Sequence, residues 1–179
     1  CCTGCTSPCG SSDVEPFAIT SAGGGSVRVV IPADVAREFR GVLARFIETL
    51  TQGLAGKGRF AWVRGLDPLV PPVHGSRARS REFRREHAVP LRHRLVDAAH
   101  RVDRQLATGP EFTLSPDDVA DWVAVCGHAQ SLYVTERWGR KPLKRAYHRD
   151  VVRWLIAVQD AVADAALDHF VTRVIAGTA

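Results

Sequence analysis

Apolar side chains recur at intervals of three and four residues in four long segments of this chain, and this spacing constrains the fold more than any other feature. The first segment runs from about residue 33 to 51. The second runs from about 78 to 107, with Pro90 inside it as a predicted kink or break. The third begins at Ser115, and the last runs from about residue 147 to 174. The pattern predicts a mainly α protein, an irregular bundle of about four helices.

Two features near the N-terminus define the predicted boundaries. Residues 27–31 are rich in β-branched side chains and alternate weakly in polarity, which predicts a short strand before the first helix. Residues 1–26 contain mostly small and polar residue types and end in a Gly/Ser run typical of a flexible linker. Because 45% of the 179 residues are hydrophobic, the rest of the chain can bury a core. We therefore expect a flexible cysteine-rich tail over 1–26 and one helical domain over 27–179.

The third helix has the clearest start signal. Ser115 is a favoured N-cap residue, and Pro116 suits the first helical position. Asp117 and Asp118 then place negative charge near the positive end of the helix. These residues predict that the helix begins directly after Ser115.

Four of the five cysteines lie within the first nine residues, at Cys1, Cys2, Cys5 and Cys9. A secreted disulfide scaffold would spread its cysteines through the fold, whereas this cluster can cross-link only itself. The pattern indicates a reducing compartment and a local redox or metal device. The fifth cysteine, Cys126, lies on the apolar side of the third predicted helix and is interpreted as a core residue.

Three interpretations of the cysteine cluster stay open. The spacing contains one C-x2-C pair and two C-x3-C pairs, and a turn near Pro8 would allow the Cα separation of roughly 4.4 to 6.8 Å that a disulfide needs. Such a small loop stabilises the fold little, so the bond would suit a switch better than a staple. The second interpretation is a zinc or iron–sulfur site, which is awkward with all ligands in one decapeptide. The third is an inert tail.

Basic residues form two clusters in a chain of net charge +5. The excess permits binding to nucleic acid or to an acidic partner without requiring it. Trp138 and Tyr147, near the second cluster, have rings able to stack on bases. Ordinary solvated faces remain the alternative. The first cluster comprises Arg77, Arg79, Arg81, Arg84 and Arg85, and the second comprises Arg137, Arg140, Lys141, Lys144, Arg145 and Arg149.

Several function classes lack a signal in this sequence. No nucleophile triad, phosphate-binding loop or dinucleotide fingerprint stands out, and the seven histidines do not show metal-binding spacing. We therefore expect no enzyme activity, no cofactor and no metal site. No apolar stretch approaches the roughly 18 residues that a membrane span needs, so a cytoplasmic location is expected. A dimer is compatible with the amphipathic helices, with Trp138 and Phe170 near possible edges.

Three segments carry a resemblance to a known family. They are residues 80–85, 112–123 and 152–160, the last with a tryptophan and a glutamine in its helical pattern. In this order they resemble an uncharacterised actinobacterial helical family that includes the oxidative-stress-sensing transcription regulators of the AosR type. The likeness covers roughly two-thirds of the chain and implies a short strand, an apolar first helix and a basic central helix.

The resemblance also implies a function. The AosR-type members are marked by a C-x3-C disulfide, which Cys5 and Cys9 would supply here, with Cys1 and Cys2 as additional thiols. The implied protein is a transcription regulator that senses oxidative stress through this reversible bond. It would then change its contacts with transcription machinery, in particular a stress sigma factor. The alternatives are a helical adaptor or DNA-binding module with an inert tail, and a small metal-binding regulator.

Overall fold

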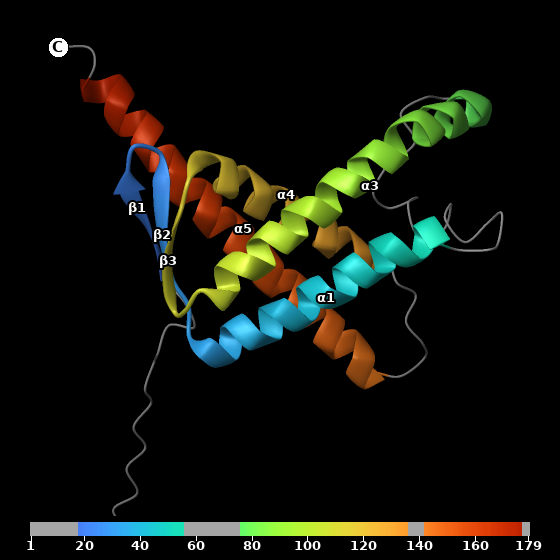
Figure 1. Cartoon of the computed structure of the whole chain (residues 1–179), viewed down its shortest axis with the longest axis horizontal. Helices are drawn as coiled ribbons and strands as arrows, with labels where there is room; N and C mark the ends of the chain where they lie inside the picture. The colour runs from blue at the N-terminus through green and yellow to red at the C-terminus, as the bar shows by residue number, and fades with distance from the viewer. Residues whose placement is uncertain (1–17, 56–75, 136–141, 177–179) are drawn as a thin grey trace, which may run out of the picture.

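A computed structural model describes residues 18–55, 76–135 and 142–176 of the chain (Figure 1). Helices dominate this part, and the prediction of a mainly α fold is confirmed. Three short strands accompany the helices and form one small sheet. In chain order the elements are β1 (Ala18–Gly23), β2 (Ser26–Val30), α1 (Ala33–Ala55), α3 (Arg77–Ala107), β3 (Glu111–Leu114), α4 (Pro116–Thr135) and α5 (Pro142–Ala176).

The sheet is antiparallel, with β2 between β1 and β3. Val27 pairs with Leu114, and both are buried against the helices. Arg28 is on the opposite, exposed face, where its side chain bonds Glu111 on β3. One face of the sheet is thus core and the other is solvated, as is usual for an antiparallel sheet.

The assignment of residues 18–26 to a flexible tail was wrong. Residues 18–23 form β1, and Gly24 and Gly25 make the hairpin turn to β2. Both glycines have positive φ angles, of 64° and 82°, which other residue types adopt only with strain. The run read as a linker is therefore a tight turn. Residues 1–17, which include the four clustered cysteines, lie outside the described part of the chain.

The helix predictions hold with changes at two points. α3 continues through Pro90 as one element from Arg77 to Ala107, so the predicted break is wrong. α5 begins at Pro142, five residues before the predicted start, with the proline in the favoured first position. α4 begins at Pro116 as predicted, and the backbone N–H of Asp118 donates to Oγ of Ser115 at 3.2 Å.

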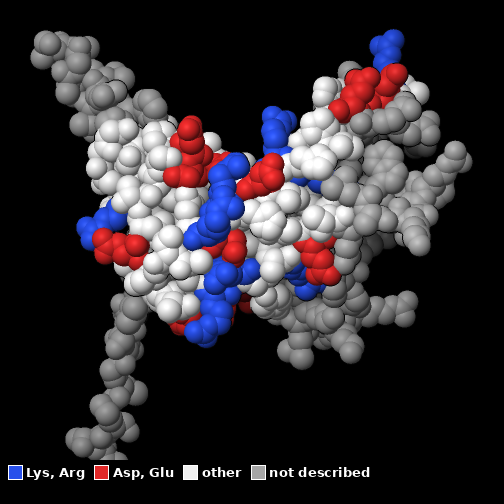
Figure 2. Space-filling model, viewed as in Figure 1, with Lys and Arg blue, Asp and Glu red and all other residues white. Residues whose placement is uncertain are grey.

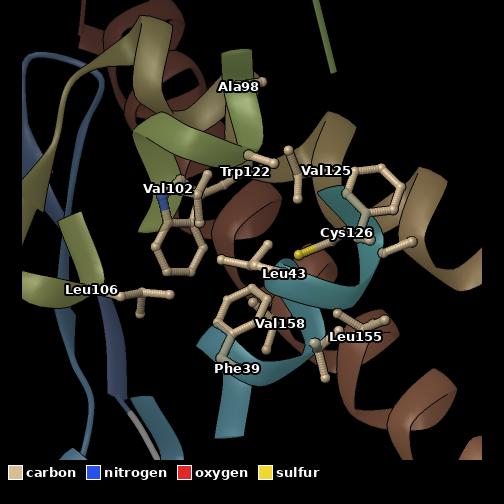
Figure 3. Packing of buried hydrophobic residues seen from close by; sticks show 14 of the residues in the cluster. Phe39, Leu43, Ala98, Val102, Leu106, Trp122, Val125, Cys126, Leu155 and Val158 are labelled. Atoms are coloured by element: carbon tan, nitrogen blue, oxygen red, sulfur yellow. The ribbon is translucent and has the colours of Figure 1, made fainter. Parts of the chain in front are cut away.

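The core lies where the four helices meet and continues under the sheet (Figure 3). Phe39 of α1 is at its centre, with its ring edge-on to Trp122 at 5.4 Å and to Trp154 at 4.7 Å between centroids. The predicted apolar stripe of α1 is confirmed, since Leu43, Phe46 and other members are buried. Val89 of α3, in contrast, is exposed.

Candidate functional site

The structure describes few of the side chains singled out from the sequence. Cys1, Cys2, Cys5 and Cys9 precede its first described residue. Of the second basic cluster, Arg137, Arg140 and Lys141 fall outside the described ranges. Lys144 and Arg145 belong to α5, but their side chains are not described, and Arg149 is exposed on the same helix. The predicted cluster is thus represented by one side chain.

Cys126 is the cysteine within the described ranges, and it is fully buried. Its thiol lies among Leu43, Val125 and Leu155 in the core (Figure 3). Burial raises the pKa of Cys126 to about 12, so the reactive thiolate is negligible near neutral pH. The interpretation of Cys126 as a core residue is confirmed.

The histidines of the described ranges are dispersed. The ring of His87 lies 4.2 Å from that of Phe83, and the buried His148 is edge-on to Tyr133 at 5.2 Å. Burial lowers the pKa of His128, which favours its neutral form. Within residues 18–55, 76–135 and 142–176, no three His, Cys, Asp or Glu side chains converge on a possible metal position.

Several arginines on the surface are paired with carboxylates. Nε of Arg40 donates to Oδ1 of Asp103 at 2.8 Å, which joins α1 to α3. Nη2 of Arg101 donates to Oδ1 of Asp121 at 2.9 Å, which joins α3 to α4. In Figure 2 the basic and acidic side chains of this face lie next to one another. These arginines fit a solvated, internally neutralised face better than a phosphate-binding surface.

Arg92 is a buried charged residue that the sequence analysis did not identify. Arg92 of α3 is 1% exposed, and its Nε and Nη2 have no hydrogen-bond partner among the described residues. Burial lowers its pKa, although an arginine still retains its proton at neutral pH. The signal was present in the sequence, because Arg92 occupies the helical stripe that contains Ala88, Leu95 and Ala99.

No helix of the described ranges is long and apolar enough to cross a membrane. The sequence matches the family described as Domain of unknown function (DUF2017) over residues 15–166. The chain belongs to the DUF2017 family. No curated protein and no solved structure matched the chain. The DUF2017 match includes β1, so the family domain begins before the boundary at residue 26 predicted from the sequence, and the four clustered cysteines precede it.

Proposed function

We propose that this DUF2017 protein is a redox-responsive transcription regulator whose sensor is the Cys5/Cys9 pair. The observation that carries the proposal is the separation of the thiols into two kinds. Four precede the family domain in one short segment, while Cys126 is buried with a pKa raised to about 12. Oxidation by peroxide requires an accessible thiolate, so reactivity should be confined to the N-terminal segment.

The proposed chemistry has two steps. The thiolate of Cys5 or Cys9 attacks a peroxide oxygen, forming a sulfenic acid and releasing hydroxide, or, from an organic peroxide, an alkoxide that takes a proton from water. The thiol of the neighbouring cysteine then displaces the sulfenic oxygen as water and forms the disulfide. The peroxide takes up the two electrons, and a cellular dithiol would return them when it reduces the bond. The reducing cytoplasm is the proposed compartment.

The short distance along the chain supports coupling between the sensor and the helical domain. Cys9 is nine residues before Ala18, where β1 begins. Closing a five-residue ring over Cys5–Cys9 would constrain residues 5–9, close along the chain to the start of the sheet. We propose that this change alters a surface presented to transcription machinery, with a stress sigma factor as the partner.

Binding to a purified RNA polymerase holoenzyme that carries a stress sigma factor would test the proposal. The full chain is compared after dithiol reduction and after peroxide treatment. The affinity is expected to differ by about tenfold, which corresponds to about 1.4 kcal/mol. Cys5→Ser and Cys9→Ser should each abolish the difference. A Cys1→Ser/Cys2→Ser double variant, which changes two thiols of the same segment, should keep it.

Three outcomes would contradict this function. If oxidation leaves polymerase binding unchanged, the tail is inert and the chain acts as a helical adaptor. If the chain instead binds duplex DNA with a steep loss of affinity in salt and no response to peroxide, it is a DNA-binding module. Zinc or iron in stoichiometric amounts, released by treatment with thiol-modifying reagent, would make it a metal-binding regulator.

A further inference from the structure

The exposed face of α5 has an ordered distribution of charge. α5 is the long C-terminal helix of Figure 1, drawn from orange to red. One stripe of its surface is basic in the first half, apolar at the centre and acidic in the second half. At intervals of three and four residues this stripe comprises Arg149, Arg153, Ile156, Asp160, Asp164 and Leu167, all exposed.

This order is unfavourable within a single helix. Arg149 and Arg153 are like charges four residues apart, and so are Asp160 and Asp164, which repel each other in the (i, i+4) relation. If one arginine and one aspartate of this set exchanged positions, both (i, i+4) pairs would join opposite charges and attract. Three exposed arginines elsewhere differ, because Arg28, Arg40 and Arg101 each pair with a carboxylate on a neighbouring element.

The α5 charges also lack partners elsewhere in the described chain. No ion pair is formed there by Arg153, Asp160 or Asp164. Arg149 approaches only Asp150, its neighbour in sequence, at 4.0 Å and on the exposed surface. The stripe therefore presents uncompensated charge of both signs to whatever lies against it.

The arginines and the aspartates of the stripe are placed symmetrically about one point along α5. With a rise of about 1.5 Å per residue, Arg153 and Asp160 lie about 5 Å on either side of the midpoint between Ile156 and Ala157. Arg149 and Asp164 lie about 11 Å on either side of it. A second α5 running antiparallel through a two-fold axis at this midpoint would set every arginine of the stripe opposite an aspartate.

We infer that this chain forms a homodimer through the exposed stripe of α5, with the two helices antiparallel. Arg153 of each copy pairs with Asp160 of the other, and Arg149 pairs with Asp164. Ile156, which is 42% exposed in the single chain, meets Ala157 of the second copy at the axis. Leu167, which is 55% exposed, reaches Ala146 at each end of the stripe.

The composition of this surface determines how strongly the dimer associates and how it responds to salt. Its apolar centre is small and its ion pairs are exposed, so we expect a reversible association that salt weakens. The inference does not depend on the proposed redox function, since no cysteine belongs to the stripe.

Sedimentation of the full, reduced chain at low and high ionic strength tests the dimer. A species of twice 19.5 kDa is expected at low salt, with dissociation into monomers as salt rises. Arg153→Asp places two aspartates opposite each other at both symmetry-related positions and should weaken the dimer by about tenfold or more. Arg37→Asp makes the same charge change on the exposed face of α1 and should leave the dimer intact.

A charge exchange separates this interface from a general effect of charge or folding. Arg153→Asp and Asp160→Arg should each weaken the dimer, and the double variant R153D/D160R should restore it, because the pairs re-form with their signs reversed. Circular dichroism should report the same helix content for all variants. A chain that is monomeric at low salt, or a dimer that R153D leaves unchanged or R153D/D160R fails to restore, would overturn the inference.

Discussion

Trp122 of α4 and Gln105 of α3 are joined inside the molecule, where the indole Nε1 donates to the amide Oε1 of Gln105 at 2.7 Å. Trp122 is 1% exposed, so its N–H is removed from water and depends on this one acceptor. The same ring is edge-on to Phe39 of α1. Trp122 therefore connects three helices and fixes the position of α4 by a polar contact as well as by packing.

Removing the hydrogen-bond acceptor of Trp122 should destabilise the protein. Gln105→Leu leaves the Trp122 N–H buried and unpaired, and we expect the free energy of unfolding to fall by about 1–3 kcal/mol. Chemical denaturation followed by circular dichroism measures the change. Arg104→Leu, an exposed polar-to-apolar change one position away, should shift stability by no more than about 0.5 kcal/mol. Equal effects of the two substitutions would show that the hydrogen bond contributes nothing.

A second prediction concerns Gly127, where α4 packs closely on α5. A Cβ added to Gly127 would lie 3.3 Å from Oε1 of Gln159, the oxygen that accepts a 2.7 Å hydrogen bond from Nε2 of Gln130. Gly41→Ala on α1 meets nothing within 4 Å and should stabilise the protein by about 1 kcal/mol through helix propensity. Gly127→Ala should stabilise the protein by less than Gly41→Ala does.

A double-mutant cycle checks the reason for the difference. In a Gln159→Ala background the contact is gone, and Gly127→Ala should then approach the gain seen at Gly41. The coupling free energy is expected to be about 0.5 kcal/mol or more. Identical effects of Gly127→Ala in both backgrounds would contradict the close contact.

The start of α4 should make stability sensitive to acid. Burial alone would raise the pKa of Asp118, but hydrogen bonds from Ser115 and Gln105 and the charge of Arg101 outweigh it and hold the pKa below the ordinary 3.8. A carboxyl group with a depressed pKa stabilises the fold above its unfolded pKa, and this contribution is lost as pH falls through the folded value.

The Asp118→Asn variant isolates this effect. It should be less stable than the wild type at neutral pH by about 1 kcal/mol, because the amide replaces a charged hydrogen-bond acceptor. The difference should shrink as pH is lowered from 5 toward 2, as measured by urea denaturation at each pH. A difference that stays constant over this range would exclude Asp118 as a source of acid sensitivity.

For Arg92 we expect that removing a polar group raises the free energy of unfolding instead of lowering it. Its guanidinium is buried without a partner at Nε and Nη2 in the described residues, and a buried unpaired charge is destabilising. Arg92→Met, which keeps an unbranched side chain about as far as Nε and removes the charge, should raise the free energy of unfolding by about 1 kcal/mol or more. The exposed Arg94→Met is the control and should change little. Destabilisation by Arg92→Met would contradict the expectation that the buried guanidinium costs stability.

The helices could be predicted from the sequence, because apolar residues on one face of a helix recur locally and leave a direct signal. The start of α4 could be located for the same reason, since Ser115 and Asp118 are close in sequence. β1 and β3 were missed. Gly24 and Gly25 look the same in a linker and in a hairpin turn, and β3 has only four residues, too few for a period to stand out.

Fewer features of the candidate site could be predicted from the sequence. The role of Cys126 could be predicted because it follows from helical spacing alone. The partners of Arg40, Arg101 and Trp122 could not, since each pair joins residues that are 17 or more positions apart in sequence. Only the arrangement of the helices brings these side chains together.

The central claim is that reversible thiol oxidation is confined to Cys5 and Cys9. Intact mass and peptide mapping of the differentially alkylated full chain, before and after peroxide, measures this at neutral pH after bound metal has been assayed. We predict a loss of two hydrogens that maps to Cys5 and Cys9 and is reversed by a dithiol. Cys126 should remain unmodified until the protein is denatured, because burial raises its pKa to about 12. Tail thiols that all stay free after peroxide, alkylation blocked by bound metal, or oxidation at Cys126 in the native protein would contradict the account.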